Sequence, residues 1–125
     1  MRPLKLDLLT SLKSTPLKED VRAFLVDREA RGLSPRTLQF YRDELGYFYT
    51  WLREQGVEAL PKVTPHVIRR WLVHLGETGR NPGGVHASYR AIKAFLRWCW
   101  AEYDLDVPNP VAKVKAPKVP QEPLE

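Results

Sequence analysis

The sequence predicts an all-α domain, folded as a compact bundle of four to five helices. In four segments the apolar residues recur at the three- and four-residue spacing of a single helix face. A hydroxyl side chain caps a helix N-terminus well, and proline suits the first helical position, where its missing N–H would have no partner. Three of the segments begin with this combination: Thr15-Pro16, Ser34-Pro35 and Thr64-Pro65. No segment shows the alternation of apolar and polar residues that is typical of a strand.

The first three predicted helices each run from a proline to a glycine. They span residues 16–31, 35–55 and 65–75 and are followed by Gly32, Gly56 and Gly76. Glycine readily adopts the left-handed conformation that ends many helices. The apolar faces of these helices predict much of the core: Leu17, Val21, Phe24, Leu25, Leu38, Tyr41, Leu45, Phe48, Leu52, Val67, Ile68, Trp71 and Leu72.

A turn-rich loop and a fourth helix complete the predicted bundle. Residues 76–84 read GETGRNPGG, and we expect no regular structure there because glycine and proline dominate the segment. The fourth helix is predicted to run from about residue 85 to residue 103. Its core stripe is predicted from the same spacing: Val85, Tyr89, Ile92, Phe95, Leu96 and Cys99.

The chain divides into three predicted parts. Residues 1–14 form an N-terminal segment with leucines at helical spacing, a candidate for a short packed helix. Residues 15–107 form the helical domain. In residues 108–125 prolines recur, so we expect one helical turn at 110–114 and then a Pro-rich, basic linker.

Composition excludes several classes of protein. The 125 residues carry a formal net charge of +5, and no apolar run approaches the ~20 residues of a membrane span, so we expect a cytoplasmic protein without a membrane partner. One cysteine permits no internal disulfide, and the three histidines follow no zinc-binding spacing. No side chains combine into a nucleophile with an aligned base. We therefore expect no metal, no cofactor and no catalytic residue in this chain.

The fourth predicted helix carries a basic stripe beside its core face. At about 100° per residue the stripe covers an arc of about 60°, and it consists of His86, Arg90, Lys93 and Arg97. No acidic residue interrupts residues 85–101, although like charges at this spacing repel. The stripe therefore predicts a negatively charged partner, with an ordinary solvated face as the alternative. Small residues beside it would let a surface such as a DNA major groove approach closely: Ala87, Ala91 and Ala94.

The second predicted helix adds two features. Its first turns bring Arg36, Thr37 and Gln39 to a positive helix terminus, a suitable place for a phosphate. A second aromatic stripe, formed by Phe40, Tyr47 and Trp51, lies apart from the core face. We interpret these aromatics as core residues covered by the N-terminal segment, and a protein partner is the alternative.

The sequence resembles the N-terminal core-binding domain of the tyrosine recombinases, the phage-integrase and Xer-like family. The resemblance covers residues 17–118 and rests on four blocks in order: FLVDREARGLSPRTLQFYRDELGYFYTWLREQG, VTPHVIRRWLVHL, VHASYRAIKAFLRWCW and VPNPVAKVKAPK. It implies a SAM-like bundle that forms one half of a clamp around duplex DNA, with the second and fourth helices facing the DNA. The family's catalytic residues lie in a C-terminal domain outside the part that this chain resembles.

The predicted function is therefore DNA binding at the core site of a site-specific recombinase during integration or recombination. The expected partners are double-stranded DNA, the catalytic domain of the same parent protein and other recombinase protomers on the DNA. The predicted DNA-binding residues are Arg36, Thr37, Gln39, His86, Arg90, Lys93, Arg97, Lys113, Lys115 and Lys118. Arg69 and Arg70 are predicted to lie outside this surface. The alternative function is a helical protein-interaction domain of the SAM-like or death-domain-like type.

Overall fold

The computed structural model describes residues 15–120, and the fold within this range is all-α. It contains four α-helices, α2 (Pro16–Ala30), α3 (Pro35–Glu54), α4 (Pro65–Glu77) and α5 (Pro82–Tyr103), and two short 3-10 helices, η1 (Leu60–Lys62) and η2 (Pro110–Lys113). These residues contain no strand, as predicted. The N-terminal segment 1–14, with its predicted short helix, and the last five residues lie outside the described range.

Side-chain caps start the helices where the sequence predicts them. The hydroxyls of Thr15, Ser34 and Thr64 each accept a hydrogen bond, 3.1 Å long, from the backbone N–H three residues ahead. Gly32 and Gly56 follow α2 and α3 with φ of +78°. At the end of α4, however, Gly76 remains helical and Gly79 takes the left-handed position with φ of +97°. The third helix therefore ends at Glu77 instead of at residue 75, the end predicted from the sequence.

The prediction of irregular structure through residue 84 is wrong. Helix α5 already begins at Pro82, so that Gly83 and Gly84 lie in its first turn. The Asn81 side chain accepts a hydrogen bond of 2.8 Å from the backbone N–H of Gly84. This cap and the proline at the first helical position offset the poor helix propensity of the two glycines.

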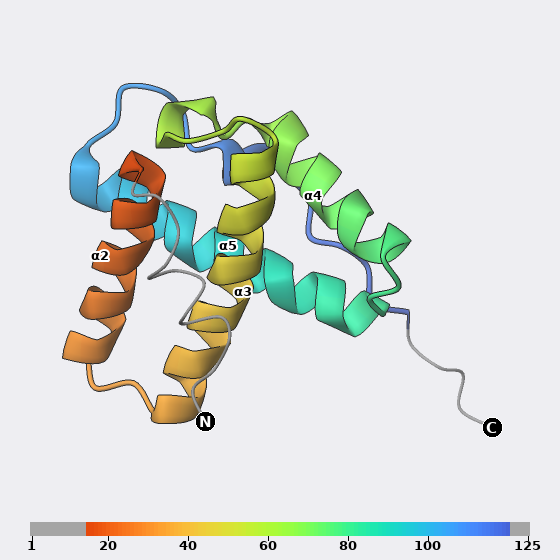
Figure 1. Cartoon of the computed structure of the whole chain (residues 1–125), viewed down its shortest axis with the longest axis horizontal. Helices are drawn as coiled ribbons and strands as arrows, with labels where there is room; N and C mark the ends of the chain where they lie inside the picture. The colour runs from red at the N-terminus through yellow and green to blue at the C-terminus, as the bar shows by residue number, and fades with distance from the viewer. Residues whose placement is uncertain (1–14, 121–125) are drawn as a thin grey trace.

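Helix α5 is the centre of the bundle because it packs against α2, α3 and α4. Figure 1 shows α2 and α3 side by side, α5 crossing behind them, and α4 on the other side of the C-terminal half of α3. Leu45, Ile68, Ile92 and Leu96 are fully buried where the helices meet. No helix in the described range has both the length and the apolarity needed to cross a bilayer.

The aromatic stripe of α3 does not form one exposed face. Trp51 is only 6% exposed, and its ring centroid lies 5.4 Å from that of Trp71 and 5.9 Å from that of His74, both on α4. Tyr47 is 40% exposed, and Phe40 is half-buried. The core interpretation is therefore correct for Trp51. The rings that pack against Trp51 come from helix α4, whereas the predicted cover was the N-terminal segment, which lies outside the described residues.

The segment that follows α5 packs against the helix bundle. The predicted turn near residue 110 is present as η2, and Asn109 caps it by accepting a hydrogen bond of 3.0 Å from the Val111 N–H. Val111 and Val114 are 5% and 6% exposed and belong to the core cluster. The first residues of the predicted linker segment 108–125 therefore pack with the helical domain.

Candidate nucleic-acid interface

The basic stripe of α5 lies on the side of the helix that faces away from the core. Arg90, Lys93 and Arg97 are exposed, and His86 is half-buried. Phe95, fully buried against Phe24 of α2, stands about 200° around the helix from both Lys93 and Arg97. None of the ion pairs found in residues 15–120 involves the stripe. Within that range, no carboxylate forms an ion pair with its cations.

Aromatic rings support the stripe and join it to α3. The Arg90 guanidinium lies 5.5 Å from the ring centroid of Phe40, and the Lys93 ammonium lies 5.9 Å from that of Tyr89. Phe40 is four residues after Arg36, so both occupy the same face of α3. The contact between Arg90 and Phe40 thus makes the stripe continuous with the first turns of α3. His86 borders the second of these rings, with its centroid 6.0 Å from that of Tyr89.

The first turn of α3 carries a capping hydroxyl pair next to an exposed arginine. The Ser34 hydroxyl accepts from the Thr37 N–H at 3.1 Å and donates to the Thr37 hydroxyl at 3.0 Å. Because Thr37 accepts that bond, its own O–H stays available as a donor. Arg36 is exposed beside it. A positive helix terminus, a hydroxyl donor and a guanidinium are therefore combined at one place.

Gln39 is oriented differently from the other predicted contacts on α3. Its side-chain Nε2 donates a hydrogen bond of 2.8 Å to Oδ1 of Asp43, one turn further along the helix. The amide is therefore engaged within the helix and stands beside a carboxylate. The structure thus places Arg90 in contact with Phe40 of α3, whereas the Gln39 amide bonds to Asp43.

Two of the three alanines beside the stripe, Ala91 and Ala94, pack within the protein itself. Ala91 is 0% exposed, and Ala94 packs partly buried against the core cluster. The expectation that these small residues admit an external surface is therefore wrong for Ala91. The reason is that α5 is covered on this side by its own bundle.

The linker lysines are exposed, and an arginine of α4 bonds to the backbone of one of them. Lys113, Lys115 and Lys118 are exposed. A hollow of about 280 Å³ separates Lys93 and Arg97 from the docked linker at Asn109, Val111, Ala112 and Val114. Arg69 donates from Nη2 to the carbonyl oxygen of Lys113 at 2.9 Å. Arg69 therefore adjoins this surface, contrary to prediction, whereas Arg70 donates to Oε1 of Gln55 at 3.1 Å.

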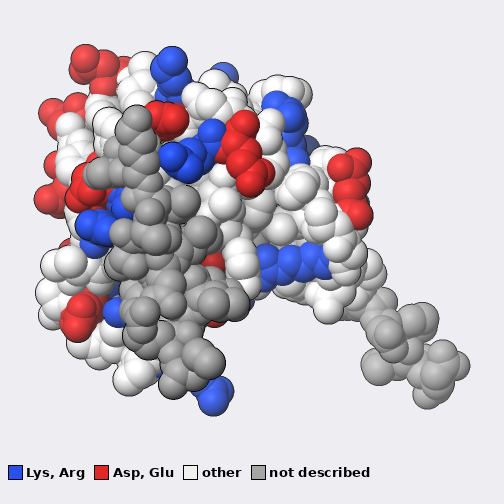
Figure 2. Space-filling model, in the orientation of Figure 1, with Lys and Arg blue, Asp and Glu red and all other residues white. Residues whose placement is uncertain are grey.

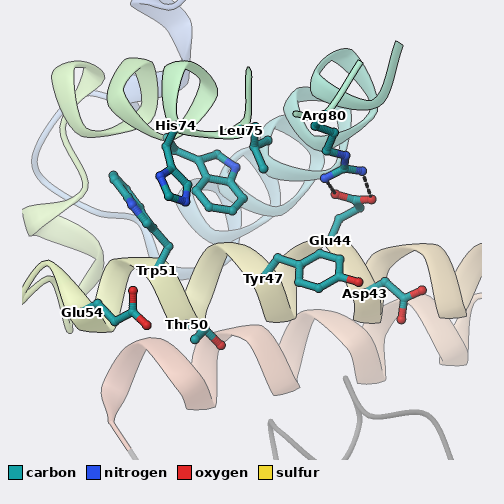
Figure 3. Close-up of a pocket in the computed structure, with 10 residues that line it drawn as sticks. Asp43, Glu44, Tyr47, Thr50, Trp51, Glu54, His74, Leu75 and Arg80 are labelled. Atoms are coloured by element: carbon teal, nitrogen blue, oxygen red, sulfur yellow. Dashed lines mark hydrogen bonds and ion pairs between the residues drawn. The ribbon is translucent and has the colours of Figure 1, made fainter. Parts of the chain in front are cut away.

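A groove between α3 and α4 is mainly acidic, in contrast to the basic stripe of α5 (Figure 3). It encloses about 570 Å³, and its walls include the acidic residues Asp43, Glu44 and Glu54 together with exposed Tyr47. The Glu44 carboxylate is paired with Arg80 through Nη1 at 2.9 Å and Nη2 at 2.5 Å. This groove carries more negative than positive charge, so a polyanion is disfavoured there. The face in Figure 2 likewise shows acidic side chains among basic ones.

Two contacts between residues far apart in the chain have no local signal in the sequence. Arg80 and Glu44 are 36 residues apart, and Trp71, which donates from Nε1 to the Ser88 hydroxyl at 2.9 Å, is 17 residues from its partner. The caps at Asn81 and Asn109 did have a signal. Each is a capping residue followed by proline, the pattern that marks the other helix starts.

The groups with shifted pKa values lie away from the stripe. Burial and the nearby Asp20 charge raise the pKa of Tyr103 to about 12. Burial also raises the pKa of Asp20, which the hydrogen bond from Tyr103 partly counteracts, and it raises the pKa of the Cys99 thiol. A thiol that is hard to ionise is a poor nucleophile and a poor metal ligand. No group of side chains in the described range has the composition to hold a metal ion.

Comparison with known proteins finds relatives over most of the chain. Residues 21–102 match the family model of the phage integrase N-terminal SAM-like domain. The chain is 32% identical over 91 residues to a protein named tyrosine recombinase XerC from Actinobacillus succinogenes, covering 73% of this chain and 30% of that protein. It is 28% identical over 111 residues to XerC from an Escherichia coli strain, covering 86% of this chain and 36% of the relative.

A tyrosine recombinase named XerD, from Chlorobaculum tepidum, is 29% identical over 89 residues, which are 71% of this chain and 29% of that protein. The chain thus spans about a third of the length of the curated relatives it matches. No solved structure matches it significantly. The matched region contains all of α3 and α4, all of α5 except its last residue and the C-terminal two-thirds of α2. The chain belongs to the phage integrase N-terminal SAM-like domain family.

Proposed function

We propose that this chain binds duplex DNA through the α5 stripe and the first turn of α3. The observation that carries the proposal is the row of exposed cations Arg90, Lys93 and Arg97, which has no ion-pair partner among residues 15–120. Keeping like charges together at one-turn spacing is unfavourable without an anion. A DNA backbone supplies a regular row of anions, and membership of a recombinase domain family makes DNA the natural source of them.

The side chains divide into contacts that position the protein and contacts that read bases. The helices contribute five phosphate contacts: Arg36, Thr37, Arg90, Lys93 and Arg97. The linker lysines Lys113, Lys115 and Lys118 lie along the sugar-phosphate backbone of the DNA. His86 is the better candidate for a base edge, because Gln39 first has to leave Asp43. An aromatic protein-interaction face receives less support, since Trp51 is buried and Phe40 lies beneath Arg90.

The proposed role is to hold a separate catalytic domain of a tyrosine recombinase on its core site, in the cytoplasm and alongside other protomers. The relatives named as tyrosine recombinases are about three times the length of the matched region. Strand cleavage and rejoining are assigned to the rest of such a protein. This chain contributes binding and orientation but no catalytic residue.

The salt dependence of DNA binding tests the proposal. Arg90→Gln combined with Lys93→Gln removes two exposed charges from the stripe and should leave folding within roughly ±0.5 kcal/mol per site. Each lost phosphate contact reduces the slope of log affinity against log salt by about 0.9, so the double variant should lose up to about 1.8 units of slope. Fluorescence anisotropy with a short mixed-sequence duplex at several salt concentrations measures both affinity and slope.

A matched control removes one arginine and one lysine elsewhere. Arg22→Gln with Lys62→Gln changes an exposed position on α2 and another in η1, past the end of α3 that is opposite Arg36. This variant should retain the wild-type slope nearly unchanged. Equal losses in both double variants would show that the protein is only generically basic, and no loss in either would exclude DNA as its partner.

A further inference from the structure

The segment that follows α5 is held in place by contacts from two different helices. The Arg69 guanidinium on α4 donates to the carbonyl of Lys113 at 2.9 Å, and the Tyr89 hydroxyl on α5 donates to the carbonyl of Val114 at 3.4 Å. Both bonds go to backbone atoms, so they fix the path of the chain whatever side chains it carries. The side chains of Val111 and Val114, which belong to this segment, are buried.

The held segment lies between two hollows that have basic walls. On one side Lys93 and Arg97 of α5 face it across about 280 Å³. On the other side Lys113 and Lys115 line a hollow of about 460 Å³ with Arg69, Leu72 and Val73 of α4. Val114 lines both hollows, so cations from α5 and from the linker stand on either side of one fixed stretch of backbone.

We propose that Arg69 is a positioning residue for DNA binding. It holds the backbone that carries Lys113 and Lys115 in a fixed position relative to Lys93 and Arg97. This inference rests on the proposed DNA-binding function. Flexible cations lose conformational freedom when they engage phosphates, whereas cations on a fixed backbone have lost most of it beforehand. Arg69 acts through the Lys113 carbonyl, and the linker and α5 then form one DNA-binding surface.

The first test is whether Arg69 holds the linker. Arg69→Met removes the donor and the charge but keeps an extended apolar stem. Trypsin cleavage after Lys113 and Lys115 should become about fivefold faster, as expected from the loss of one net hydrogen bond. Cleavage after Lys118 should not change, because Lys118 lies beyond the held segment. Arg70→Met is the matched control, since the adjacent Arg70 bonds to Gln55 instead.

The second test separates positioning from a direct phosphate contact by Arg69. Lys113→Gln with Lys115→Gln is combined with Arg69→Met in a double-mutant cycle, and DNA affinity is measured with the same duplex. If Arg69 acts through the linker, the lysine substitutions should weaken binding at least twofold less in the Arg69→Met background than in the wild type. They should have their full effect in the Arg70→Met background.

Arg69→Lys supplies the rescue, because an ammonium at this position can still donate to the Lys113 carbonyl. It should restore most of the protection from trypsin. It should also restore most of the effect that the Lys113→Gln and Lys115→Gln substitutions have on DNA affinity. Unchanged cleavage after Lys113 and Lys115 in Arg69→Met, or strictly additive losses of affinity, would overturn the proposal. If the wild-type chain shows no salt-dependent DNA binding, the proposed function fails and this inference fails with it, while the trypsin result still shows whether Arg69 holds the linker.

Discussion

Arg80 occupies the space that a side chain at position 84 would need. A Cβ atom on Gly84 would lie 2.8 Å from Nε and 2.9 Å from Cγ of Arg80. Arg80 cannot withdraw freely because both of its terminal nitrogens bind the Glu44 carboxylate. The φ angle of Gly84 is not positive, so this glycine is required by the close approach of Arg80 and not by its own backbone conformation.

At this residue scale we predict a substitution whose effect changes sign with its neighbour. Gly84→Ala should lower the free energy of unfolding by about 1–2 kcal/mol in the wild type, because the added methyl group displaces a pinned side chain. In an Arg80→Ala background it should raise that free energy by up to about 0.5 kcal/mol, because alanine favours a helix more than glycine does. Urea unfolding followed by circular dichroism measures the four proteins of the cycle.

Gly83→Ala is the control for this cycle. A Cβ atom there would meet only Oδ1 of Asn81, at an ordinary contact distance of 3.5 Å. Its effect should be neutral or stabilising in both backgrounds. The explanation would be wrong if Gly84→Ala changed stability by the same amount with and without Arg80.

At the scale of elements, the helix starts are predictable because their signals are local. A capping side chain and a proline lie next to each other in the sequence and act on the turn that follows them. This is why α2, α3 and α4 begin at their predicted prolines. The predicted start of α5 at residue 85 is wrong because the Asn81-Pro82 pair, with its cap bond to the Gly84 N–H, outweighs the poor helix propensity of Gly83 and Gly84.

The end of α5 offers a second prediction at this scale. Asp104 has φ of 51° and ψ of 54°, and it is the only residue other than glycine with a positive φ in the described range. Asp104→Gly should raise the free energy of unfolding by about 0.5–1 kcal/mol, because glycine avoids the Cβ strain and a negative charge leaves the helix C-terminus.

Asp106→Gly is the comparison for this substitution. It removes the same side chain two residues later, where φ is not positive, and should not raise stability. Thermal unfolding of the three proteins distinguishes them. Equal changes in melting temperature for both variants would rule out the left-handed conformation of Asp104 as the cause.

At the scale of the whole molecule, the sequence predicts the fold class and the basic stripe. It does not predict which residues from different helices contact one another. Helical spacing alone places Arg90, Lys93 and Arg97 on one face. Nothing local indicates that Arg69 meets the backbone of Lys113, 44 residues later. Nor could spacing show that the ring above Trp51 comes from Trp71. Contacts of this kind depend on how helices pack, and packing is set by the whole core.

The extent of the folding unit gives a prediction at the same scale. A chain that ends after Pro108 loses the buried side chains of Val111 and Val114, whereas a chain that ends after Lys118 retains them. The shorter chain should be less stable by about 3 kcal/mol or more, at about 1.5 kcal/mol or more for each valine. The longer chain should match the 125-residue protein in urea unfolding. Equal stability of the two truncated chains would place the domain boundary at residue 108.

Cys99 lies fully buried on α5, the helix that carries the basic stripe on its outer side, and it is the only cysteine of the chain. A thiol reagent can therefore modify the native protein only when the bundle opens around α5. A ligand that binds only the closed form lowers the population of the open form by a factor of 1 + [ligand]/Kd, and the rate of modification falls by the same factor when reclosing is faster than modification. The rate at which Cys99 reacts with such a reagent would consequently measure DNA occupancy of the opposite face of the helix, with no label attached to either molecule.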